Sequence, residues 1–173
     1  VLRKETENIT ADYPNLAELI DNMFQTMHNS DGIGLAAPQI GLAIRLFVID
    51  ATPMQEDFPE IETAKKVFIN PEIIDHSEET IAYEEGCLSV PGIHEKVTRP
   101  SEVTVHYFDE NFVEHTDKFT GFFARIVQHE YDHLEGHVFT DRVSPLRRQM
   151  ISSKLQNIQK GKVVHKVNVT KTN

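Results

Sequence analysis

The feature that most constrains the fold is the segment from Thr120 to Leu134, whose apolar residues recur at helical spacing. The pattern predicts a helix that Gly136 ends. His129 and His133 lie on the apolar face of this helix, four residues apart. The histidines therefore lie on the face of the helix that we expect the fold to bury.

The upstream segments predict a second helix and a series of strands. Apolar residues at helical spacing between Pro14 and His28 indicate an amphipathic N-terminal helix. The glycine-rich residues 31–41 predict a loop, 44–50 a buried strand, and 51–66 an exposed acidic loop. Further strands are predicted at 67–69, 72–75, 80–84, 93–98, 102–108 and 112–118, and a C-terminal helix from Ser144 to Gly161. This order is typical of an α+β fold with antiparallel or mixed sheets around the central helix.

Length and hydropathy predict one domain and no membrane segment. The chain has 173 residues without an internal repeat or a Pro/Gly-rich linker, so we expect a single domain over residues 1–173. No apolar run approaches the roughly 18 residues that a membrane-spanning helix needs. The first ten residues lack the apolar segment of a secretory signal, and we expect the protein in the cytoplasm.

The charge is unevenly distributed along the sequence. A formal net charge of -10 argues against a surface that grips nucleic acid, and we expect no sequence-specific nucleic-acid binding. Residues 147–173, predicted to be a basic C-terminal helix and tail, nevertheless contain seven Lys or Arg residues and no acidic residue. This segment is interpreted either as a solvated helix face or as a docking segment for the ribosome.

Residues 128–136 contain the pattern H-E-x-x-H, which indicates a metal site. On a helix, His129 and His133 can direct their rings at one metal ion. Glu130, next to the first ligand, can then reach a water on the metal without being a ligand itself. A catalytic site of this kind needs a third protein ligand and one position for water.

The third ligand separates two interpretations. A His or Glu downstream of Gly136 would indicate a zinc endopeptidase, but the nearby candidate, His137, faces away on the helix. Upstream, Cys87 lies in a short turn-like segment between Gly86 and Pro91 and is the only cysteine of the chain. A site of one thiolate and two imidazoles suits zinc, iron, nickel or cobalt.

Three blocks then carry a family resemblance. They are GIGLAAPQIG at 32–41, EGCLS at 85–89 and QHEYDH at 128–133, and in this order they resemble the three signature segments of peptide deformylases. The likeness extends from the first residues to the Ser-Pro-Leu of 144–146. It implies a hydrolase that removes the N-formyl group from the N-terminal methionine of new polypeptides.

The resemblance also implies roles for individual residues. The metal ligands would be Cys87, His129 and His133, holding one divalent ion, in the cell Fe²⁺. Glu130 would be the acid/base, with Gln39 and the backbone N–H of Leu88 on the formyl oxygen. Backbone groups near Ile33, Gly34 and Gly86 would pair with the substrate as an added strand, and Phe122, Arg125 and Ile126 would border the methionine pocket.

Two further interpretations stay open at this point. A zinc endopeptidase shares the helix pattern but does not explain the blocks around Cys87 and Gln39. A non-catalytic, ribosome-associated metal protein would need a closed shell of four ligands, and the sequence offers three good ones. Asp132 is interpreted as a structural partner rather than as a catalytic group, and Arg99 either as the partner of a nearby acid, which we favour, or as a contact of the substrate.

Overall fold

The computed structural model describes residues 6–87 and 90–136, with the backbone alone for 86–87 and 90–95. Over these residues the strands form a five-stranded antiparallel sheet of order β1-β2-β3-β6-β7 and a two-stranded sheet β4-β5. The strands are β1 (Gly34–Ala36), β2 (Leu46–Asp50), β3 (Lys65–His76), β4 (Thr80–Cys87), β5 (Val90–Pro100), β6 (Glu102–Phe108) and β7 (Glu114–Thr120). The helices are α1 (Leu16–Asn29), α2 (Gly121–Leu134) and the short 3₁₀ turns η1 (Ala37–Ile40) and η2 (Thr52–Met54). The α+β prediction is confirmed.

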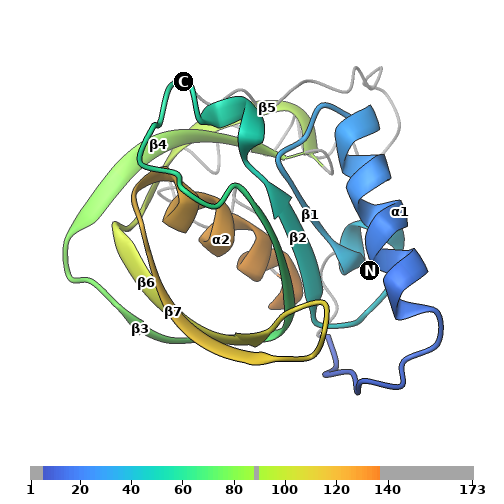
Figure 1. Cartoon of the computed structure of the whole chain (residues 1–173). Coiled ribbons are helices and arrows are strands. Elements are labelled where there is room, and N and C mark those ends of the chain that lie inside the picture. Colours follow the sequence, from blue (N-terminus) through green and yellow to red (C-terminus); the bar gives the residue numbers. More distant parts are fainter. Residues whose placement is uncertain (1–5, 88–89, 137–173) are drawn as a thin grey trace.

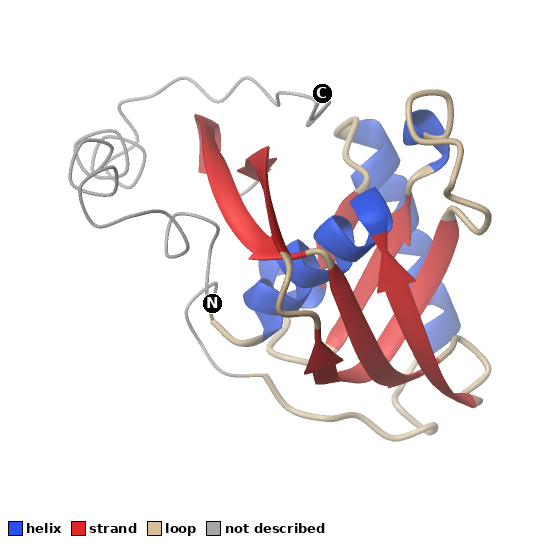
Figure 2. Cartoon of the chain, turned by 90° about the vertical axis from the view of Figure 1, so that its left-hand side faces the viewer, coloured by secondary structure: helices blue, strands red, loops and turns tan. Residues whose placement is uncertain are grey.

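The central position of α2 is confirmed. Figures 1 and 2 show this helix inside the curve of the larger sheet, with β4-β5 on its other side. Eleven of its fourteen residues are buried. A helix with so little exposed surface packs against neighbours in several directions, which is more cover than its apolar face alone required.

Strand β2 separates two cores, and this explains why four of its five residues are buried. Successive side chains of a strand point to opposite faces. Phe47 and Ile49 pack in the core around α2, whereas Leu46 and Val48 pack in the core under α1. The uninterrupted apolar stretch 46–49 is therefore typical of a strand in a sheet that is covered on both faces.

Helix α1 covers the second face of the sheet. It turns Ile20, Met23, Phe24 and Met27 toward the sheet and leaves its other side to solvent. The predicted range of 14–28 differs from the observed one by two residues at the start and one at the end. Both helices predicted within the described residues are therefore present.

Two sequence expectations about loops were wrong in part. Residues 31–41 were predicted as a loop, but they contain β1 and η1, because Gly34 to Ala36 pair with Phe47 to Ile49 at the edge of the sheet. Residues 51–66 were predicted to be exposed. Instead, the Ala51 N–H donates to the Ala64 carbonyl at 2.8 Å, and this closure turns Met54 and Ile61 into the core.

The predicted strands 67–69 and 72–75 form one strand, β3. Asn70, at φ 51°, bends the strand without ending it, and the register shifts between Ile69 and Glu72. Asn tolerates this left-handed conformation. Its side chain is held by hydrogen bonds of 2.8 Å with the N–H and the carbonyl of Ile9.

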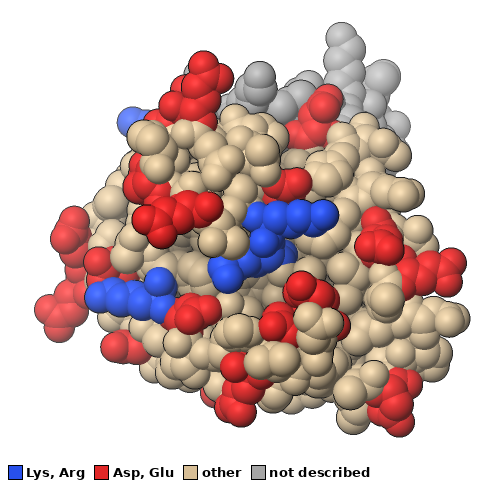
Figure 3. Space-filling model, in the orientation of Figure 1, with Lys and Arg blue, Asp and Glu red and all other residues tan. Residues whose placement is uncertain are grey.

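In Figure 3 a few Lys and Arg side chains lie among more numerous acidic ones, in keeping with the net charge of -10. None of the helices within the described residues has the length and apolarity to cross a bilayer. The predicted C-terminal helix and the basic segment 147–173 lie outside the described residues, and the single domain stays a prediction.

Candidate active site

Helix α2 carries the residues of the H-E-x-x-H pattern to the middle of the molecule. The ring centroids of His129 and His133 are 5.3 Å apart, with an angle of 74° between the planes. His133 is fully buried, and Glu130, between them in sequence, is 5% exposed. Burial of a charged carboxylate costs free energy unless the group is paired, hydrogen-bonded or coordinated to a metal.

Strand β4 supplies a carboxylate that orients His129. Glu85 Oε1 lies 2.7 Å from His129 Nδ1, and the Glu85 side chain is 4% exposed. Because an ionised carboxylate only accepts hydrogen bonds, Nδ1 carries the proton. This assigns metal coordination by the ring to Nε2, which is the arrangement found around metal-binding histidines. The imidazole pair on one helix face, with the tautomer of His129 set in this way, fits a divalent metal.

Glu85 is also the centre of a buried charge network. It accepts hydrogen bonds from Arg99 Nε at 2.7 Å and Nη2 at 2.9 Å, and from Arg125 Nη1 at 2.6 Å. Arg99 in turn donates through Nη1 to Asp132 at 2.7 Å. The network joins β4 and β5 to α2, so it holds the two-stranded sheet against the helix that carries the histidines.

The network keeps these groups charged in spite of their burial. Burial alone would raise the pKa of Glu85, but the Arg99 guanidinium and the hydrogen bonds from His129 and Arg99 hold that pKa far below its usual value. Burial alone would likewise lower the pKa of Arg99, and the carboxylates of Glu85 and Asp132 raise it instead. The structural interpretation of Arg99 and Asp132 is in keeping with these contacts.

Gly34 of β1 lies against Glu130. A Cβ atom built on Gly34 would be 2.6 Å from Glu130 Oε1 and 2.9 Å from both Cδ and Cγ. The space that the missing side chain leaves is therefore filled by the glutamate.

Gln39 lies in η1, directly after β1. Its side-chain oxygen accepts a hydrogen bond of 2.8 Å from the Ala36 N–H. This bond fixes the orientation of the amide and makes its NH₂ group the donor end. Ile33, just before β1, packs partly buried against the core around α2, and its carbonyl accepts from the Asp50 N–H at 2.9 Å.

The three residues predicted to border a methionine pocket lie on α2 and are buried. The ring of Phe122 stacks on Phe58 at 4.4 Å, and Ile126 is in the same core. Arg125 donates to Glu85 and to the carbonyls of Val97 and Ile81. Through these contacts Arg125 holds β4 and β5 against α2, whereas its role at the border of a methionine pocket stays a prediction.

The remaining predicted residues are described only in part. Gly86 pairs with His94, and Cys87 pairs with Val90 at a register shift that ends β4. The side chain of Cys87 and the whole of Leu88 lie outside the described residues. Among the side chains that the structure does describe, no three of the metal-ligating types form a cluster. The ligand role of Cys87 therefore stays a prediction.

Sequence reasoning missed Glu85. Two features of the sequence could have indicated its role. Glu85 lies in the same block as Cys87, and Arg99 and Arg125 are positive charges next to or within segments predicted to pack in the fold. No local pattern shows that these three charges meet, because 40 residues separate Glu85 from Arg125.

The fold and the site together define a class, an α+β hydrolase whose buried helix carries an H-E-x-x-H pattern. The chain belongs to the Polypeptide deformylase family, whose defining pattern matches residues 1–149. Family membership makes the protein a hydrolase of N-terminal processing in protein biosynthesis. It also decides against the zinc endopeptidase and against the non-catalytic binding protein.

Similar proteins share most of the chain. The peptide deformylase of Christiangramia forsetii is 49% identical over 171 residues, which cover 94% of this chain and 87% of that protein. The peptide deformylase of Flavobacterium johnsoniae is 50% identical over 169 residues, with 94% and 86% covered.

Solved structures show the same fold. A peptide deformylase from Plasmodium falciparum superposes with a TM-score of 0.82 at 37% identity, covering 95% of this chain and 94% of the other. Peptide deformylase 1B from Arabidopsis thaliana, in complex with an inhibitor, has a TM-score of 0.82 at 36% identity, with 93% and 86% covered.

Proposed function

We propose that this protein removes the N-formyl group from the N-terminal methionine of nascent polypeptides in the cytoplasm and releases formate, using one divalent metal ion. The observation that carries the proposal is the pair of imidazoles on α2, the partly buried His129 and the fully buried His133, with Glu85 on the Nδ1 atom of the first ring. The family membership supports the same activity.

Cys87, His129 and His133 would hold the metal, which we expect to be Fe²⁺ in the cell, with Zn²⁺, Ni²⁺ or Co²⁺ as substitutes. When bound, the ion supplies Lewis-acid activation of water, whose pKa it lowers toward about 7. Two soft or borderline donor types, thiolate and imidazole, are compatible with each of these ions. The choice among them depends on availability.

Glu130 would transfer the proton. Its carboxylate takes a proton from the attacking water and returns it to the departing amine, so one residue serves both steps. Its burial beside the two histidines keeps it in one place for this task. The glutamate needs no ligand role.

The oxygen of the formyl group would be bound by two donors. The Gln39 amide, oriented by its bond to Ala36, presents NH₂, and the backbone N–H of Leu88 supplies the second donor. Each donor of this kind contributes about 3 kcal/mol to transition-state stabilisation. The substrate backbone would add as a strand beside Ile33, Gly34 and Gly86, with the methionine side chain near Phe122, Arg125 and Ile126.

The experiment is release of formate from formyl-Met-Ala-Ser by protein purified without oxygen, with elemental analysis of the bound metal. Glu130→Gln should keep the metal and lose activity, whereas Cys87→Ala should lose the metal. The opposite pattern would overturn these roles. An acetyl-Met peptide should not be hydrolysed, because the site is expected to admit only hydrogen on the reacting carbon; equal rates for both peptides would contradict this selectivity.

The basic segment 147–173 would dock on the ribosome, from which the substrate emerges. Seven positive charges without an acid favour contact with ribosomal RNA, and such contact weakens as salt rises. Co-sedimentation with ribosomes should be lost on deletion of residues 147–173. Co-sedimentation that the deletion leaves unchanged would count against the docking role.

A further inference from the structure

Gly34 has a backbone conformation that does not require glycine. The described glycines with positive φ are Gly41, Gly121 and Gly136, and Gly34 is not among them. It lies in β1, where its Cα pairs in register with Ile49 of β2. Any L-residue adopts such a conformation, so the reason for glycine at this position has to be space.

The side chain of Glu130, the acid/base candidate, occupies the space beside the Gly34 α-carbon. The Cβ of an alanine at position 34 would be 2.6 Å from Glu130 Oε1 and 2.9 Å from Cδ and Cγ. Carbon and oxygen atoms that are not bonded to one another do not approach so closely in folded proteins. One of the two partners would have to move.

The backbone of β1 is the less movable partner. It is paired with β2, and the neighbouring Ile33 carbonyl accepts from the Asp50 N–H at 2.9 Å. The residues that follow, Leu35 and Ala36, are 3% and 0% exposed. The Glu130 side chain, with its rotatable bonds, would yield before the strand does.

We propose that Gly34 is a positioning residue for Glu130: the bare α-carbon of β1 is the surface against which the carboxylate rests. The absence of a side chain at position 34 thus serves the enzyme's own glutamate, and not only the approach of a substrate backbone. The kinetic consequence rests on the proposed function of Glu130, whereas the packing relationship does not depend on it.

The kinetic test is Gly34→Ala with the metal bound. A misplacement of about 1 Å in an active site can cost about 100-fold in rate, and we expect kcat of Gly34→Ala to fall by up to about that factor. Metal content should stay close to that of the parent protein, because the ligands are unaltered, and a fall in kcat beyond any change in KM reports the displaced acid/base rather than substrate pairing. A raised KM with unchanged kcat would instead assign Gly34 to substrate pairing alone and overturn the proposal.

The packing test is a double-mutant cycle in thermal unfolding of the metal-loaded protein. Gly34→Ala should lower Tm by several degrees in the parent protein, but much less in the Glu130→Ala background, where the clash is removed. Gly41→Ala is the matched control, since its Cβ would meet no atom within 4 Å and its cost comes from a φ of +87°. That cost should be equal in both backgrounds.

The two tests separate the inference from the proposed function. If Gly34→Ala lowers Tm equally with and without Glu130, the packing relationship is wrong, even in an active deformylase. If the parent protein releases no formate but the coupling is present, the proposed function fails and the packing relationship holds.

Discussion

Glu85 Oε1 and His129 Nδ1 lie 2.7 Å apart, although 44 residues separate them in the sequence. This contact links β4, which ends at Cys87, to the helix that carries both histidines. The same carboxylate forms ion pairs with Arg99 and Arg125. The position of the imidazole is therefore tied to the charge balance of the buried network.

We expect Glu85→Gln to weaken both the metal site and the fold. A neutral amide keeps the shape but leaves two buried guanidinium groups without their shared anion. Loss of such an outer partner typically lowers metal affinity about 10- to 100-fold. Competition with a chelator measures the affinity, and urea unfolding measures the stability.

The control is Glu84→Gln, the same change at the neighbouring exposed residue of β4. Surface substitutions of this kind change the free energy of unfolding by no more than about 0.5 kcal/mol. Equal metal affinities for the two variants would show that Glu85 does not support His129.

Arg99→Leu should be strongly destabilising, because it removes the buried cation that pairs with Asp132 and one of the two that pair with Glu85. Breaking a buried ion pair on one side costs about 3–5 kcal/mol. Lys118→Leu is the comparison: its ion pair with Glu102 spans 2.8 Å, but the two side chains are 61% and 38% exposed. An exposed pair contributes less than about 1 kcal/mol. Urea unfolding that gives similar values for both variants would contradict the role of the buried network.

The sequence predicted best those elements whose apolar residues recur at a single regular spacing, every second residue in a strand or every three to four in a helix. Strand β6 has the predicted bounds of 102–108, because its buried residues alternate with partly exposed ones along one face. Helix α2 was predicted to within one residue at its start, since its apolar positions recur through four turns. These patterns are local, and the side chains needed to read them are close in sequence.

The elements that the sequence did not predict depend on distant partners. Gly34 to Ala36 become a strand only because β2 offers an edge, and Ile61 is buried only because the Ala51–Ala64 closure folds the segment inward. The site shows the same division. His129, Glu130 and His133 follow from one helix turn, whereas Glu85 and the packing of Gly34 on Glu130 require the assembled fold.

Thr6→Val tests how the N-terminal segment supports the site. The Thr6 hydroxyl donates to the Leu134 carbonyl at 2.7 Å, in the last turn of α2, where helix carbonyls lack partners within the helix. Loss of this bond should lower the free energy of unfolding by about 1 kcal/mol. Thr10→Val, which removes an exposed hydroxyl bonded to Asp12, is the control and should have a smaller effect. A larger loss for Thr10→Val in thermal or urea unfolding would contradict the expectation.

Asp50, at the end of β2, should make stability depend on acid pH. His28 Nε2 lies 2.8 Å from its Oδ2, and the N–H and hydroxyl of Thr52 donate to its Oδ1. Burial raises the pKa of Asp50, but the hydrogen bonds from Thr52 and His28 outweigh it and hold the pKa below the usual value of 3.8. The ionised carboxylate therefore stabilises the fold above about pH 4, and this contribution is lost as the pH falls through the lowered folded-state value.

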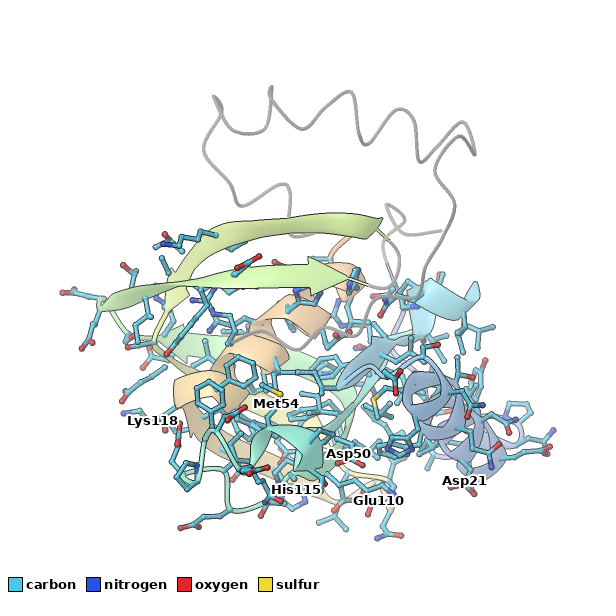
Figure 4. All side chains as sticks on the ribbon, turned by 90° about the horizontal axis from the view of Figure 1, so that it is seen from above. Asp21, Asp50, Met54, Glu110, His115 and Lys118 are labelled. Carbon is cyan, nitrogen blue, oxygen red and sulfur yellow. The ribbon has the colours of Figure 1, made fainter. Side chains whose placement is uncertain are left out.

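We accordingly expect Asp50→Asn to be less stable than the parent protein at pH 7, with a difference that shrinks as the pH falls below 4. Urea unfolding at several pH values between 7 and 3 measures it. Asp21→Asn, the same change on the exposed side of α1, is the control; Figure 4 labels both residues. Because Asn cannot ionise, a stability difference that stays constant from pH 7 to pH 3 would mean that ionisation of Asp50 does not stabilise the fold.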